Sequence, residues 1–373
     1  MHPVRNPLQA GTRTGHGEHD MVEKSEESPV GPGPALLERA RSLLRDFPAF
    51  DVHAHPGRSF ASGAKALSPA IARIAGGPPD EAAVVADMQA GGMRAAVFAG
   101  VADLEVLDLD GERLTTGRSF EPGEAWSSYL AQAGRLAGLA AQGIVTPILA
   151  ADDLLALAAG GPPGACLAME GGDFLEGDAG RVAIAHADGF RIIGLVHYRS
   201  NELGDAMTEP PVHDGLSTAG AQVVEAMNAA GMLIDLTHAS EAMCRQVLEN
   251  SRHPVMLSHS HVACGCTPFS RFNTPELARA VAGRGGLIGA WPAGIGISDI
   301  AGFADRVLEL VNLVGVEHVA LGTDMGANYR PVWASYRDTP VVVASLMERG
   351  LADRSVAAII GGNMRRVLAD SVG

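Results

Sequence analysis

Five histidines and two acidic residues occupy one kind of position in the sequence, each at or near the end of a short apolar run. They are His53, His55, Glu170, His197, His238, His259 and Asp324. Imidazole nitrogens and carboxylate oxygens are common ligands of zinc and similar divalent ions. A core histidine with a satisfied hydrogen bond explains most single cases. Seven polar residues that repeat one position instead indicate a site where metal ions support a reaction.

The spacing of the first two histidines suits a shared ion. One residue separates His53 from His55, and side chains two positions apart lie on the same face of a strand. Glu170 ends the run CLAME before two glycines, so its carboxylate would emerge into a tight turn and could bridge two cations. The alternative for Glu170 is a strand-end carboxylate that caps a helix N-terminus.

Two later histidines would bind a second ion. His238 ends the run MLIDLTH, and His259 lies at the end of PVMLSHS. His261 has the same parity as His259 and could replace it, although it lies farther along the loop. The strand-end position favours His259.

Two further residues could act on a substrate. Asp324, in ALGTDMG, could move protons beside the metals, or it could accept backbone N–H bonds in the turn at Gly326. His197, in GLVHYRSN, could stabilise an oxyanion, or it could be a core histidine. Asp324 and His197 are therefore the predicted catalytic residues.

Nine apolar or β-branched runs alternate with helical patterns, which is typical of a parallel sheet with crossover helices. The runs cover residues 49–55, 94–101, 143–150, 165–172, 191–197, 232–238, 254–260, 286–292 and 318–324. A barrel needs eight strands, so one run is wrong or peripheral. No Gly-rich phosphate loop follows the first run, which argues against an open doubly wound sheet. We therefore predict an α/β fold, a (β/α)8 TIM-like barrel.

Composition, charge and cysteine content predict the domain organisation and the cellular compartment of the protein. Residues 1–34 are polar and rich in glycine and proline, which predicts a flexible, disordered tail before a single barrel domain over residues 35–373. The formal charge of −15 argues against a nucleic-acid partner. No apolar run reaches the roughly 18 residues of a membrane span. Four cysteines, of which Cys264 and Cys266 are interpreted as loop residues, indicate the cytoplasm.

Seven stretches carry a resemblance to a known family through their order and spacing: HAHP, MEGG, GLVHYRSN, DLTHAS, SHS, LGTD and GGNMRRVL. Over roughly residues 45 to 370 the chain resembles the membrane dipeptidases, also called renal dipeptidases, which are binuclear zinc hydrolases with a barrel fold. The resemblance implies a metallohydrolase that cleaves the amide bond of dipeptides with two divalent ions, zinc being the expected metal. The partner would be a small peptide or peptide-like substrate. Whether the chain forms a homodimer is left open by the sequence.

The resemblance also implies a role for each residue. The metal ligands would be two histidine pairs and one bridging carboxylate: His53 with His55, His238 with His259, and Glu170. His197 would bind the substrate and steady the oxyanion. Asp324 would pass a proton from the attacking water to the leaving amine. Arg271 and Asn273 would contact the terminal carboxylate of the substrate.

Three departures from the family pattern bear on the metals and on the substrate. The family usually has aspartate where this chain has His55, so the site carries one negative charge less. The arginine that grips the substrate's carboxylate belongs to an Arg-Asn pair in the family, whereas Phe272 separates Arg271 from Asn273 here. After Asp324 the chain reads MGANYRP where relatives commonly have Phe-Asp-Gly. The change at His55 is expected to affect the metal preference or the acidity of the bridged water, and the change after Asp324 indicates a changed substrate choice.

Two other functions stay open from the sequence. One is a different amidohydrolase that acts on a lactone, a cyclic amide or an ester, as the HxH opening encourages. Such enzymes often use a carboxylated lysine as the bridge between the metals, and no predicted strand ends in lysine. The other is a non-catalytic metal-binding barrel that kept the ligands and lost the activity.

Overall fold

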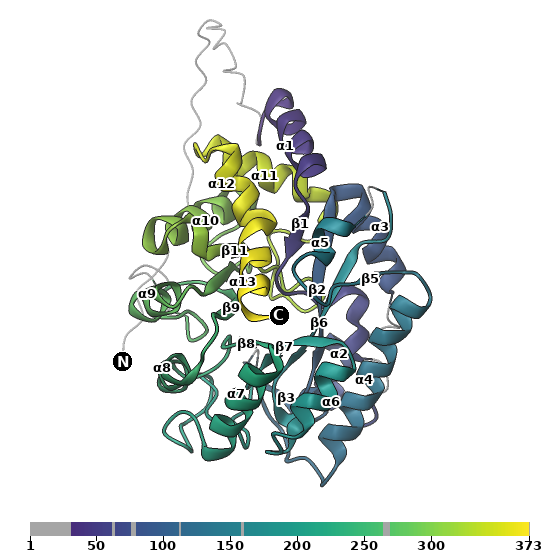
Figure 1. The fold of residues 1–373 in the computed structure, drawn as a ribbon, viewed down its shortest axis with the longest axis vertical. Coiled ribbons are helices and arrows are strands. Elements are labelled where there is room, and N and C mark those ends of the chain that lie inside the picture. Colours follow the sequence, from purple (N-terminus) through teal and green to yellow (C-terminus); the bar gives the residue numbers. More distant parts are fainter. Residues whose placement is uncertain are drawn as a thin grey trace, which may run out of the picture. The chain divides into compact units, whose positions relative to one another are not determined.

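Eight parallel strands form a closed barrel, and the helices lie around it (Figure 1). The computed structural model describes residues 31–61, 64–75, 80–111, 113–157, 160–263 and 269–372. In order around the barrel the strands are β1 (Ala49–Asp51), β2 (Met93–Val101), β6 (Gly164–Glu170), β7 (Phe190–Gly194), β8 (Leu233–Asp235), β9 (Val255–Ser260), β10 (Leu287–Ala290) and β11 (Val319–Leu321). Pairing of β11 with β1 closes the ring. The predicted (β/α)8 TIM-like barrel is confirmed.

One of the nine predicted strands is peripheral. The run at residues 143–150 forms only the short strand β5 (Thr146–Pro147), which pairs with the start of β6. Pro147 has no N–H to donate, so it cannot continue a central ladder. Two strands that the sequence did not predict, β3 (Leu107–Asp110) and β4 (Arg113–Thr116), form an antiparallel hairpin of their own.

Helices follow the strands and have ordinary caps. Asp80, Ser217 and Thr274 each accept a hydrogen bond from the third residue of the helix that they precede. The α-helices are α1 (Pro34–Asp46), α2 (Pro69–Ile74), α3 (Glu81–Gly91), α4 (Glu124–Ala141), α5 (Asp153–Ala156), α6 (Arg181–Ala187), α7 (Thr218–Ala230), α8 (Glu241–Asn250), α9 (Pro275–Gly283), α10 (Ile300–Val314), α11 (Thr339–Glu348), α12 (Asp353–Ala357) and α13 (Asn363–Ser371). Shorter turns of helix are η1 (Pro56–Ala61), η2 (Leu104–Val106), η3 (Asp173–Leu175), η4 (Val316–His318), η5 (Tyr336–Asp338) and η6 (Ala358–Gly362).

The barrel interior is a packed core rather than a channel. Alternate residues of the strands point inward and are buried, among them Phe50, Val97, Cys166, Ile192, Leu233, Met256, Leu287 and Ala320. Met364, Val367 and Leu368 of α13 belong to the same apolar cluster, so this helix packs against the barrel core. The polar residues lie instead at the carboxyl ends of the strands, where barrel enzymes place their active sites.

Some of the sequence predictions fall on residues outside those that the structure describes. Residues 1–30 of the predicted tail lie outside the described residues, as do Cys264 and Cys266. Helix α1 begins at Pro34, and its buried Leu43 and Leu44 belong to the main apolar core. Among the described residues, no helix combines the length and the apolar character needed to cross a membrane.

Candidate active site

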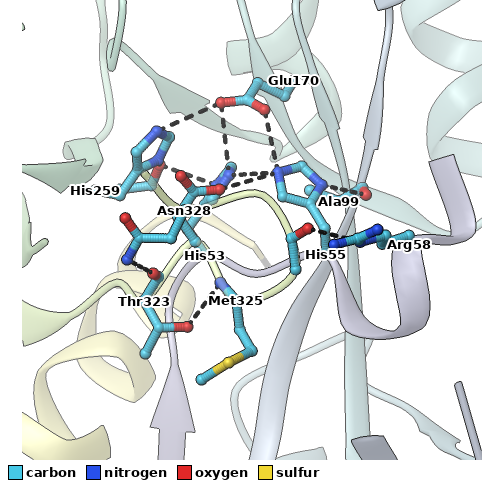
Figure 2. A network of polar contacts seen from close by, with 12 residues as sticks. His53, His55, Arg58, Ala99, Glu170, His259, Thr323, Met325 and Asn328 are labelled. Atoms are coloured by element: carbon cyan, nitrogen blue, oxygen red, sulfur yellow. Dashed lines mark hydrogen bonds and ion pairs between the residues drawn. The ribbon is translucent and has the colours of Figure 1, made fainter. Parts of the chain in front are cut away.

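Five imidazole rings surround one carboxylate at the carboxyl end of the barrel. Their Nε2 atoms lie 2.9–3.5 Å from the oxygens of Glu170. Figure 2 shows Glu170 facing the rings of His53, His55 and His259. We call this group the donor cluster; it consists of His53, His55, Glu170, His197, His238 and His259. All six side chains are buried.

The barrel itself aims these side chains. Glu170 is the last residue of β6 and shares the inward parity of Cys166 and Ala168. In β9 a register shift sets Leu257 opposite Ile288 but Ser260 opposite Ala290, so one extra residue is accommodated between them. Such a bulge re-aims side chains. Ser258 and His259, although consecutive, therefore both contact the inside of the site.

Two site residues follow their strands in a strained backbone conformation. His238 has a φ of 77° and Asp324 a φ of 56°, a left-handed region that residues with a side chain rarely adopt. Strain of this kind costs about 1–3 kcal/mol per residue and is concentrated at functional sites. The fold therefore holds both side chains at a cost, which is consistent with a functional role.

The distances within the donor cluster fit metal ions. The Nε2 atoms of His53 and His55 are 3.2 Å apart, and so are those of His238 and His259. Two nitrogens bound at 2.0–2.1 Å to a tetrahedral zinc would lie about 3.3 Å apart. Overlapping sets of three donors also lie within 4.8 Å of one another: His53, Glu170 and His259; His53, His55 and Asp324; Glu170, His197 and His238. The donors therefore form one continuous set.

A hydrogen bond holds the far side of four of the five rings; among the described residues, His238 Nδ1 is the exception and has no partner. His55 Nδ1 donates to the carbonyl oxygen of Ala99 at 2.9 Å. The Nδ1 atoms of His53 and His259 each lie 3.1 Å from Ser258 Oγ. A proton on Nδ1 leaves the Nε2 lone pair free for a metal, and such contacts fix the ring orientation. Ser258 was not among the residues predicted from the sequence.

Charge and burial set the protonation states. Burial lowers the pKa of His238 and His259 well below the usual value, so these rings stay neutral at pH 7, the form that binds metal. Burial alone would also lower the pKa of His53, but the carboxylates of Glu170 and Asp324 outweigh it and raise this pKa to about 9. The same negative charges that hold a proton on His53 would also favour a metal cation at this position.

His197 is oriented by a carboxylate that the sequence analysis missed. Its Nδ1 lies 2.6 Å from Asp103 Oδ1, while the other oxygen of Asp103 accepts the backbone N–H of Tyr198. Burial alone would lower the pKa of His197, but Asp103 and Glu170 outweigh it and raise this pKa. Asp103 follows β2 by two residues, so the rule of polar residues at strand ends would have found it.

Asp324 and Arg271 lie at the same site, whereas Asn273 does not. Asp324 Oδ1 is 3.5 Å from His55 Nε2, and burial raises the pKa of Asp324 to about 6. Arg271 donates to Tyr198 Oη at 3.0 Å, and its Nη2 lies 3.2 Å from His259 Nε2. Asn273 instead donates to Ser260 Oγ at 2.6 Å and does not line the cavity.

The alternative ligand His261 points elsewhere. Its Nε2 lies 3.2 Å from a carboxylate oxygen of Glu309 in α10. His259, two residues earlier, is among the donors around Glu170. His261 lies beyond the last residue of β9, where the backbone pairs with the loop at Asn273, so the alternation of the strand no longer sets its direction.

An open cavity of about 640 Å³ lies over the donor cluster. On one side it is lined by apolar residues that we call the apolar wall: Phe60, Ile71, Val101, Leu104, Leu107 and Leu114. Among the described residues that line the cavity, Arg271 is the one arginine or lysine, and Glu170 and Asp324 are the carboxylates. The cavity thus joins a polar reaction centre to an apolar surface.

Comparison with known proteins identifies the family. A sequence model of the family "Membrane dipeptidase (Peptidase family M19)" matches residues 37–372. The chain therefore belongs to the membrane dipeptidase family, as the motifs predicted. It is 35% identical over 214 residues to "Dipeptidase aclJ" of Aspergillus oryzae, an alignment that covers 55% of this chain and 50% of that protein. It is 28% identical over 218 residues to "Dipeptidase 3" of Rattus norvegicus, covering 54% and 44%. The alignments thus span about half the length of these curated relatives.

Solved structures share the fold. The probable dipeptidase PvdM from Pseudomonas aeruginosa superposes with a TM-score of 0.76 at 18% identity, covering 91% of this chain and 99% of that one. A metallo peptidase from Rhodobacter sphaeroides, liganded with a phosphinate mimic of the dipeptide L-Ala-D-Ala, gives 0.70 at 20% identity, covering 87% and 99%. These likenesses support the barrel architecture.

Proposed function

We propose that the chain is a metal-dependent dipeptidase that hydrolyses the amide bond of small peptides. One observation carries the proposal. Five imidazole nitrogens lie within 3.5 Å of a single buried carboxylate, in a cavity that also holds a second carboxylate and one arginine. Without cations, that many mutually facing donors would compete for protons at a desolvated site. Membership of the membrane dipeptidase family supports the same activity.

Two divalent ions, with zinc as the expected metal, fit the donor set. His53 and His55 would hold one ion, His238 and His259 the other, and Glu170 would bridge both. When bound, two such ions polarise a carbonyl group and bring the pKa of water toward neutrality. Neutral imidazoles and a carboxylate are the ligands that zinc prefers when thiolates are absent.

The chain's own residues would move the proton and bind the developing charge. Asp324, beside His55 and with a pKa raised to about 6, can accept a proton from water and return it to the leaving amine. His197, whose Nδ1 contacts Asp103, presents Nε2 to the site and can donate to the oxyanion. Both roles remain part of the proposal.

Arg271 would bind the terminal carboxylate of the substrate. Its guanidinium is buried beside Tyr198 and His259, and its Cζ atom lies over the ring of Trp291, 5.2 Å from the ring centre. A guanidinium matches a carboxylate with two parallel hydrogen bonds. Although Phe272 separates it from Asn273, Arg271 reaches the cavity; Asn273 supports the loop through Ser260.

The metal bridge argues against the amidohydrolases that use a carboxylated lysine. The sequence has two lysines, Lys24 and Lys65. Lys24 lies outside the described residues, and Lys65 is exposed in the segment before α2. Glu170 already occupies the position between the histidine pairs. A dipeptide is therefore favoured over a lactone or a cyclic amide.

The test is hydrolysis by the zinc-loaded chain of a panel of dipeptides, lactones, cyclic amides and esters. We expect release of free amino acids from dipeptides and the loss of this activity after chelation. Preferential cleavage of lactones or cyclic amides would contradict the proposal. Bound metal without hydrolysis of any compound would instead support a non-catalytic barrel.

A cytoplasmic location also stays a proposal. Cys166 and Cys244 are free and buried in the described structure, where burial raises the pKa of both thiols. Free thiols of this kind persist in a reducing compartment.

A further inference from the structure

The apolar wall lies next to the donor cluster, but its residues come from other segments of the chain than the proposed metal ligands. Phe60 comes from η1, Ile71 from α2, and Leu104 from η2. Leu107 and Leu114 come from the β3–β4 hairpin. Together with Val101 they form a separate apolar cluster of the core, and they line the same cavity as Glu170 and Asp324.

Among the described residues, those on the wall side of the cavity carry no charge. The members of the wall are aliphatic or aromatic, and Ile74, at the end of α2, adds an aliphatic side chain to the cavity lining while 52% exposed. Arg271 contacts Tyr198 and His259, and Asp324 contacts His55. A charged side chain placed against the wall would lose its hydration without an ion-pair partner, which is costly.

Phe60 of the wall and Arg271 contact rings of different histidine pairs in the donor cluster, while Tyr198, to which Arg271 donates, packs against the apolar cluster beside them. Phe60 packs edge-on against the ring of His55, with 5.1 Å between centroids, and His55 faces Glu170 Oε2. Arg271 contacts His259, which faces Glu170 Oε1. A dipeptide whose carboxylate binds Arg271 and whose amide lies over the donor cluster therefore directs its N-terminal residue past His55, toward the part of the wall formed by Phe60.

We propose that the apolar wall is the subsite for the side chain of the substrate's N-terminal residue and that it selects large uncharged side chains. The inference rests on the proposed dipeptidase function. Burial of each additional methylene of that side chain against the wall favours the bound state, so leucine or phenylalanine is preferred to glycine. Aspartate and lysine at this position are excluded.

Several side-chain contacts hold the hairpin that carries Leu114: Arg113 donates to the carbonyl oxygen of Thr208, Asp108 accepts from Ser68 Oγ, and Glu209 joins β4 to a neighbouring loop. Glu209 accepts a hydrogen bond from Thr116 Oγ1 of β4 at 2.7 Å and another from the backbone N–H of Ser200 at 2.8 Å. Ser200 follows Tyr198, the residue that Arg271 contacts. The hairpin is thereby fixed to the loop beside the reaction centre, and the wall is formed before substrate binds.

The experiment measures kcat/KM of the zinc-loaded chain for two series, X-Ala and Ala-X, where X is Gly, Leu, Phe, Asp or Lys. We expect Leu-Ala to exceed Gly-Ala by about 10- to 100-fold, with a smaller spread in the Ala-X series. In Leu114→Thr the ratio of Leu-Ala to Gly-Ala should fall about tenfold. The matched control Leu155→Thr changes an exposed leucine of α5 and should leave the ratio unchanged.

The outcomes separate this inference from the proposed function. If dipeptides are hydrolysed but the apolar preference is absent, or follows X only in Ala-X, the subsite is overturned while the dipeptidase stands. If no dipeptide is hydrolysed, the proposed function fails, and calorimetry with phosphinate analogues of Leu-Ala and Gly-Ala tests the wall by binding alone. Affinity about tenfold higher for the Leu-Ala analogue supports the wall; equal affinity overturns it.

Discussion

The donor cluster and the apolar wall meet in one cavity but are built by different parts of the fold. The donors stand at the ends of strands that are paired on both sides, so the barrel's register sets their positions. The wall comes mainly from η1, α2 and the β3–β4 hairpin, segments outside the barrel's ring of strands. Substitutions in the donor cluster should therefore abolish chemistry, whereas substitutions in the wall should change which substrate is used.

The largest effect is expected at the shared ligand of the donor cluster. Glu170→Gln removes the negative charge between the two histidine pairs, so kcat/KM should fall by about a thousandfold or more and bound metal should decrease. Steady-state kinetics and elemental analysis measure both effects. Glu225→Gln, an exposed position on α7, is the matched control. Unchanged metal content in Glu170→Gln would remove Glu170 from the ligand set.

Substitution of Asp324, the proposed proton-transfer residue, should reduce activity less than Glu170→Gln and should leave the metal bound. Asp324→Asn keeps the size of the side chain but cannot carry the proton, so kcat should fall about a hundredfold or more. The metal content should match that of the unaltered chain. Near-normal turnover would refute the assignment of Asp324.

Arg271→Ala should act on substrate binding. Loss of charge-assisted hydrogen bonds to the substrate's carboxylate, worth about 2 kcal/mol, should raise KM about thirtyfold while kcat changes little. In the unaltered chain, a dipeptide amide, which lacks that carboxylate, should have a higher KM than the dipeptide. In Arg271→Ala the two KM values should become similar. An unchanged substrate profile in Arg271→Ala would exclude the arginine from the binding site.

The smallest effect is expected at the anchor of the hairpin. Glu209→Gln weakens the contacts that hold β4 to the loop at Ser200, so we expect about a threefold loss in the ratio of Leu-Ala to Gly-Ala. Activity on Gly-Ala is the internal reference. A loss of equal size for both dipeptides would show that the hairpin supports the donor cluster rather than the wall.

The donor cluster could be predicted from the sequence because the carboxyl ends of all the barrel strands lie on the same side of the barrel. The runs ending near His53, Glu170 and His238 therefore predicted residues that the structure brings together. Parity alone could not separate His259 from His261, because β9 ends at Ser260 and the alternation of side chains does not extend to His261.

Features that depend on tertiary contacts could not be predicted from the sequence. The β3–β4 hairpin was missed because LDLD and RLTT are short and polar, without the apolar run that marks a buried strand. The positions of Arg271 and Asn273 depend on the loop after β9, where one side chain turns to Tyr198 and the other to Ser260. Asp103 and Ser258 act through a neighbouring ring, which spacing in the sequence does not reveal.

The most direct test of the central claim is the number of zinc ions that the chain binds, measured by equilibrium dialysis and elemental analysis. We predict two per chain, and one per chain in His238→Ala, because the pair of His53 and His55 keeps its ion. Fewer than one ion per chain, or an unchanged count in His238→Ala, would contradict a two-metal site formed by the donor cluster.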